Sequence, residues 1–181
     1  EPMPHRMSLT AAVILCAATA APAQDLAPVD VAGMSREAFT ERYVESYAAQ
    51  LDWTKEAFTR VDPAYAENVD ARTPVTDAER AVAGCLYDVA DSDQKKEQLG
   101  LQLAMVARLD EMVEADPDLD YVDVAFGDVV TDITDFDPSQ ELGAMMQACN
   151  ATQVAMQRMD LSPEIFAVLQ DKATERGYIE P

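Results

Sequence analysis

Carboxylates are the side chains of this sequence that could do chemistry, because imidazole is almost absent. The single histidine, His5, precedes a segment that we predict to be removed from the mature chain. Without histidine the mature chain has no imidazole base for a Ser-His-Asp or Cys-His nucleophile and no HExxH zinc site. The sequence also lacks GxGxxG, Walker and GxSxG motifs. We therefore expect no cofactor and no histidine-dependent hydrolysis.

An acidic segment, residues 116–137, is the candidate cation site. Its first three aspartates have the one-three-five spacing with which a calcium-binding EF-hand loop begins, but the glycine and the glutamate required at the sixth and twelfth positions are missing. A solvated acidic face is the default interpretation, and a calcium site is the alternative. The candidate ligands are Asp116, Asp118, Asp120, Asp128 and Asp132.

A carboxylate-dependent enzyme that acts on a glycan is a further alternative. Such an enzyme needs two carboxyl groups in a cleft, with the pKa of one raised by an apolar neighbourhood. The acidic residues that lie beside apolar stripes are Glu79, Asp88, Asp110 and Glu141. With 34 acidic residues in the chain, many pairings arise by chance, so the sequence designates no catalytic residue.

Aromatic residues offer a candidate protein-binding patch. Trp53 lies among charged residues at the end of a regular apolar stripe, and Tyr43 and Tyr47 precede it by about two turns. An exposed tryptophan with tyrosines is typical of a protein-binding surface. The alternative is that Trp53 covers the edge of the core.

The N-terminal residues predict export. The stretch 9–20 is apolar, no acidic residue occurs between Met7 and Ala23, and Ala21-Pro22-Ala23 matches the A-x-A cleavage signal. We predict a signal peptide over residues 1–23, of which residues 1–6 lie upstream of Met7. A flexible segment over 24–34 and a helical domain over 35–181 follow. No other apolar run reaches the length of a membrane span.

The charge of the chain limits its partners. Thirteen basic residues against 34 acidic ones give a net charge of −21. Such a chain repels nucleic acid and anionic lipid, and it attracts cations and basic protein surfaces. Adaptation to high salt would give the same acidity without any partner.

Two cysteines remain after the expected cleavage, Cys85 and Cys149. In an oxidising compartment they favour a disulfide, which would stabilise the fold by about 4 kcal/mol on the chain-entropy model. The alternative is a pair of buried thiols. A disulfide predicts that the helix beginning at Thr76 packs against the helix beginning at Pro138.

Apolar residues recur at helical spacing along most of the domain, which predicts an all-α fold of five to six helices, bundle-like or orthogonal. The expected helices cover residues 35–58, 76–89, 92–114, 138–156 and 162–176, with a linker packed by Tyr65 over 61–75. Residues 120–136 fit a helix or a strand, and we take them as helix.

The leading functional hypothesis is an exported protein, periplasmic or secreted, that is not an enzyme. It would bind another exported or envelope protein or serve an envelope-accessory role. This hypothesis rests on the missing catalytic motifs and on a small helical domain held by a disulfide.

Overall fold

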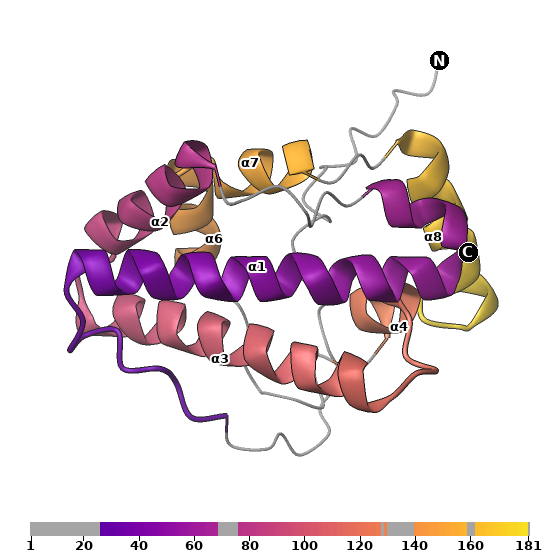
Figure 1. Ribbon diagram of the computed structural model, residues 1–181, viewed down its shortest axis with the longest axis horizontal. Helices are drawn as coiled ribbons and strands as arrows, with labels where there is room; N and C mark the ends of the chain where they lie inside the picture. Colours follow the sequence, from indigo (N-terminus) through magenta and orange to yellow (C-terminus); the bar gives the residue numbers. More distant parts are fainter. Residues whose placement is uncertain (1–25, 69–75, 128, 130–139, 159–161, 181) are drawn as a thin grey trace.

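The computed structural model describes residues 26–68, 76–127, 129, 140–158 and 162–180. These residues contain seven α-helices and one 3-10 helix and no strand, so the expected all-α class is confirmed (Figure 1). The predicted signal peptide lies outside the described residues. Among the described helices, none is long and apolar enough to cross a membrane. The elements are α1 (Arg36–Val61), η1 (Pro63–Asn68), α2 (Asp77–Val89), α3 (Asp93–Ala115), α4 (Tyr121–Phe126), α6 (Gln140–Ala148), α7 (Ala151–Arg158) and α8 (Pro163–Glu175).

The long helix α1 runs through the middle of the molecule, and α2 and α3 pack against it (Figure 1). An ion pair between Arg36 and Asp88 joins the start of α1 to the end of α2, so these two helices are antiparallel. Arg60 donates from the end of α1 to the carbonyl oxygens of Val113 and Asp116 at the end of α3, so α1 and α3 are parallel. The remaining helices cover the two ends of this trio.

Local signals in the sequence fix most helix ends. Thr76 and Glu79 form the expected capping box at the start of α2, in which each side chain accepts from the backbone N–H of the other residue. Ser162 caps α8, and Pro163 occupies its first position. Gly177 follows α8 in the left-handed conformation, with φ of 79°. The predicted capping box, the predicted Ser-Pro helix start and the predicted glycine helix end are all confirmed.

The helix expected over 138–156 is instead two helices, α6 and α7. Between them Asn150 adopts a φ of 54°, in the left-handed region that asparagine tolerates better than most residues. The break turns α7 away from α6, and Leu142, Met145 and Cys149 remain buried. The predicted start at Asp137-Pro138 lies outside the described residues.

Two segments whose sequence pattern is ambiguous contain helix in the structure. The linker predicted over 61–75 contains the 3-10 helix η1, from which Tyr65 packs edge-on against Phe58 with ring centroids 6.4 Å apart. Residues 69–75 lie outside the described residues. In the segment 120–136, Asp120 caps α4, which ends before Gly127, and Val129 is also helical; the other residues after Gly127 lie outside the described residues.

Two hydrophobic clusters fill the ends of the molecule. One joins the second halves of α1 and α3 to α4 and α8, and its centre includes Phe58 stacked on Tyr121 with ring centroids 4.0 Å apart. The other joins the first halves of α1 and α3 to α2, α6 and α7. Each cluster is therefore closed by helices from the C-terminal half of the chain.

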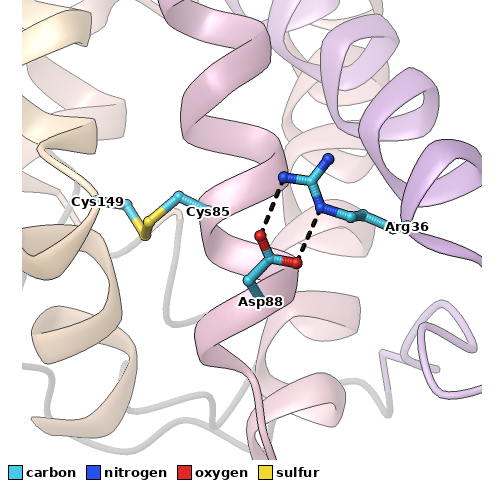
Figure 2. Close-up of a disulfide and its surroundings, with 4 residues drawn as sticks. All are labelled: Arg36, Cys85, Asp88 and Cys149. Carbon is cyan, nitrogen blue, oxygen red and sulfur yellow. Dashed lines mark hydrogen bonds and ion pairs between the residues drawn. A yellow bond between two sulfur atoms is a disulfide. The ribbon is translucent and has the colours of Figure 1, made fainter.

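The predicted disulfide is confirmed and braces the second cluster. Cys85 of α2 bonds to Cys149, directly after α6, with Cα atoms 5.7 Å apart. As predicted, α2 packs against α6, and it also packs against α7. Figure 2 shows the disulfide on one side of α2 and the Arg36–Asp88 pair on the other.

Residues 26–34, which we call the strap, belong to the segment that the sequence predicts to be flexible, and they contact the helices. Val31 is only 1% exposed within the second cluster, whereas Leu26 packs against the first. The backbone N–H of Val29 donates to the carbonyl oxygen of Gly100 on α3 at 3.2 Å. The sequence analysis did not predict these contacts, because apolar residues do not recur at a regular spacing in this segment. Single apolar residues can still hold such a segment against the core. The strap thus contacts both clusters.

Gly100 is the position where the strap comes closest to α3. A Cβ atom at this residue would lie 2.1 Å from the carbonyl oxygen of Val29, which is backbone and has little room to move. We expect Gly100→Ala to lower the free energy of unfolding by about 2 kcal/mol, as overpacking does. Urea denaturation of the purified protein measures this change.

Gly143 on α6 provides the matched control, since a Cβ atom there meets nothing within 4 Å. Gly143→Ala should raise stability by about 0.5–1 kcal/mol, because alanine is the better helix former. An unchanged or raised stability for Gly100→Ala would show that the strap does not seat against α3.

Candidate functional site

The charged residues that the structure buries lie at the starts of two helices. Glu79 and Asp120 are the buried charged residues among those described, and they are 3% and 6% exposed. Each belongs to a capping box, the first on α2 and the second on α4. These two carboxylates are therefore the candidate functional groups of the interior.

Glu79 forms a two-pronged ion pair with Arg158, the last residue of α7. The arginine donates from Nε to Oε1 at 2.5 Å and from Nη2 to Oε2 at 2.8 Å. Thr76 donates to the same carboxylate from its backbone N–H at 2.6 Å. One carboxylate thus caps α2 and binds α7, and both charges suit the helix ends at which they lie.

Asp120 and Asp123 repeat this arrangement on α4. Arg176, the C-cap of α8, donates from Nη1 and Nη2 to the two oxygens of Asp120, at 2.9 and 2.6 Å. Asp123 accepts from Arg176 at 2.5 Å and from the hydroxyl of Tyr178 at 2.8 Å. The carboxylates that start α4 therefore bind the end of α8.

The bonds to Glu79 and Asp123 favour the ionised form of these two carboxylates. Burial would raise the pKa of Glu79, but the hydrogen bonds from Arg158 and Thr76 outweigh it, and the pKa lies below its ordinary value. The pKa of Asp123 is lowered in the same way, by backbone and side-chain donors that outweigh its burial. A carboxyl group held in this state is unsuited to act as a general acid near neutral pH.

Two tyrosines of the predicted protein-binding patch lie beside Glu79. Burial, followed by the negative charge of Glu79, raises the pKa of Tyr43 to about 12 and also raises the pKa of Tyr47. The two rings stack with centroids 6.4 Å apart. Both hydroxyls therefore stay protonated at neutral pH, and the hydroxyl of Tyr47 is buried.

Trp53 is not part of an exposed patch, because the structure leaves only 2% of it accessible. It packs in the first cluster near Leu51 and Ala57, and its Nε1 has no hydrogen-bond partner among the described residues. The sequence placed Trp53 among charged neighbours, but its helical position turns the ring inward. The large apolar residues that are exposed in the described chain are Val168 and Tyr178.

The acidic residues considered for catalysis are spread over different parts of the molecule. Glu79 and Asp88 lie near opposite ends of α2, about 13 Å apart along the helix axis, and glycosidase carboxyl groups lie within about 10 Å of each other. Asp88 is exposed and bonded to Arg36 by two hydrogen bonds, of 2.9 and 3.0 Å. Glu141 is exposed on α6.

The candidate cation ligands are only partly described. Asp116 accepts from the backbone N–H of Asp118 at 3.0 Å, while Asp120 is occupied by Arg176. Asp128 and Asp132 lie outside the described residues. Within the described part of the chain, no group of three or more His, Cys, Asp or Glu side chains could hold a metal ion.

Arg158 and Arg176 are the important residues that the sequence analysis missed. The available signal was their position at the ends of helices, where a cation is favourable. Each lies more than 50 residues from its carboxylate partner, so no local spacing connects them.

Comparison of the chain with protein families, curated proteins and solved structures found no match.

Asp110 has a charge environment opposite to that of Glu79. Its partial burial on α3, together with the charges of Glu114, Asp52 and two further glutamates, raises the pKa of its carboxyl group. The ionised form is therefore less favourable in the folded chain than in the unfolded chain. Between the ordinary pKa of 3.8 and the raised value the folded chain binds more protons, so the contribution of Asp110 to stability falls as pH rises.

Asp110→Asn should raise the free energy of unfolding at neutral pH by about 0.5 kcal/mol, since it removes repulsion between like charges four residues apart. The gain should shrink as pH falls through the raised pKa of Asp110, and it should vanish below 3.8, where the carboxyl group is protonated in both states. Thermal unfolding at pH 4 and pH 7 measures both effects.

Asp93→Asn on the same helix is the control, because Asp93 lies in the first turn, where a negative charge is favourable. This substitution should lower stability slightly. Equal effects of the two substitutions would contradict the environment assigned to Asp110.

Proposed function

We propose that this protein is an exported, non-catalytic helical module that binds another exported or envelope protein through a basic surface of that partner. The proposal rests on the role of the buried carboxylates, which hold helices together. Glu79 and Asp120 each cap one helix and bind an arginine of another, so they serve as joints between helices. A fold whose interior charges are committed to such joints suits a rigid binding module.

The expected partner follows from the charge of the chain. Its net charge is −21, and each of the seven arginines in the described residues forms an ion pair within the chain. The positive charges are thus largely neutralised internally, while acidic residues such as Glu37 and Asp52 are exposed. The negative electrostatic potential of such a surface speeds association with a basic surface, and salt screens this effect.

The disulfide supports the export part of the proposal. A bond between Cys85 and Cys149 persists in an oxidising compartment and is rare in a reducing one. Together with the predicted leader it favours the periplasm or the medium outside the cell.

A binding experiment on the exported fraction of the source cell tests the proposal. The mature chain should form a stoichiometric complex with one basic protein at 150 mM salt, seen by size-exclusion chromatography and mass spectrometry. The complex should dissociate in 500 mM salt, because the attraction is electrostatic.

Two variants of equal charge separate specific binding from general adsorption. Glu37→Gln with Asp52→Asn changes the exposed face of α1, and Asp171→Asn with Glu175→Gln changes that of α8. A specific interface should respond to one pair at least fivefold more than to the other. Equal responses, or turnover of peptidoglycan by the purified chain, would contradict a dedicated binding module.

A further inference from the structure

The surface of α6 and α7 differs in charge from the rest of the molecule. From Leu142 to Met159 the sequence contains no aspartate or glutamate, although the whole chain contains 34 acidic residues. The one charged residue of this stretch, Arg158, is held in the ion pair with Glu79. We call the exposed residues from 143 to 153 the acid-free face, and they are Gly143, Ala144, Gln147, Ala148, Asn150 and Gln153.

The acid-free face lacks the groups that keep the rest of the molecule in solution. The net charge of −21 repels other copies of the chain and hydrates its surface. On the acid-free face this charge is replaced by glycine, alanine and neutral amides. An attached carbohydrate is bulky and solubilising, so it would hydrate and cover a surface of this kind.

The acid-free face also contains an acceptor motif for such a carbohydrate. Asn150-Ala151-Thr152 matches the N-x-[ST] pattern of N-linked glycosylation, in which the middle residue is not proline. The other asparagine of the chain, Asn68, is followed by Val69 and Asp70 and does not match. The acceptor asparagine thus lies where the acidic residues are missing.

The structure leaves the side chain of Asn150 available for attachment. Asn150 is exposed at the break between α6 and α7. Its backbone N–H donates to Gln147 at 3.1 Å and its carbonyl oxygen accepts from Val154 at 3.0 Å, whereas its side-chain amide makes no hydrogen bond to the described residues. The left-handed φ of 54° favours asparagine here, but it does not require Thr152. The threonine is therefore a separate feature of the motif.

We propose that Asn150 carries an N-linked oligosaccharide that covers the acid-free face. In the transfer, Nδ2 of Asn150 attacks C1 of an oligosaccharide carried on a lipid pyrophosphate. The bond from Nδ2 to C1 forms, the bond from C1 to the pyrophosphate oxygen breaks, the amide loses one proton and the lipid pyrophosphate leaves. This inference rests on the proposed export, because it requires the chain to cross into a compartment that contains the transferase.

The fold sets the order of transfer and folding. Thr152 lies in the first turn of α7, and Ala151 is only 4% exposed. A transferase that reads all three residues of the motif must therefore act before α7 packs against α2. The finished fold then keeps Asn150 on the outside.

Mass spectrometry of the protein isolated from its source cell tests the proposal. The intact mass of the exported chain should exceed the mass of its polypeptide by one oligosaccharide. Fragmentation by electron transfer, which leaves glycans attached, should place this excess on Asn150. The same spectrum gives the N-terminal residue, so export is measured independently.

Two substitutions of Thr152 separate glycosylation from the structural role of Asn150. Thr152→Ser keeps the acceptor motif, and the modification should persist. Thr152→Val removes the hydroxyl but leaves Asn150 and the size of residue 152 almost unchanged, and the modified fraction should fall at least tenfold. Urea denaturation of both variants checks that the fold is retained.

An exported chain with an unmodified Asn150 would overturn the glycosylation and leave the proposed binding function standing. Equal modification of the Thr152→Val and Thr152→Ser variants would also overturn it, because the motif would then not be what the transferase reads. A chain that stays inside the cell with residues 1–23 attached would overturn the proposed export and this inference together.

Discussion

A carboxylate that starts one helix and binds the arginine at the end of another is the interaction on which the ends of this fold depend. Glu79 with Arg158 joins α2 to α7, and Asp120 with Arg176 joins α4 to α8. In both cases the negative charge lies at a helix N-terminus and the positive charge at a helix C-terminus. The dipole of each helix therefore stabilises the charge at its own end. Each joint closes one hydrophobic cluster.

The burial of the carboxylates makes these joints costly to lose. Glu79 is buried, and without Arg158 it would be a buried charge held only by its cap. The exposed pairs, such as Arg80 with Glu41, contribute far less because water screens them. The disulfide between Cys85 and Cys149 reinforces the joint that Arg158 makes, since both attach the α6–α7 layer to α2. The result is a domain whose helices are joined by buried ion pairs and a disulfide and whose net charge is −21, which is the basis for the binding function proposed here.

Local chemistry explains which features could be predicted from the sequence. The caps at Thr76 and Ser162, the glycine after α8 and the helical periods depend on neighbouring residues, and the structure confirms them. The disulfide followed from the predicted compartment. The partners of Glu79 and Asp120 could not be predicted, because they come from arginines more than 50 residues away. The break at Asn150, the inward turn of Trp53 and the docking of the strap likewise depend on tertiary packing.

A double-mutant cycle on Glu79 and Arg158 tests this account most directly. Glu79→Gln and Arg158→Met are made singly and together, and the free energy of unfolding is measured by urea denaturation at pH 7. If the pair is the joint that closes this end of the molecule, Arg158→Met alone should cost about 3–5 kcal/mol, and the double variant should recover about 2 kcal/mol relative to the sum of the single changes. Single effects that add to within about 0.5 kcal/mol would show that the two residues act independently and would contradict the account.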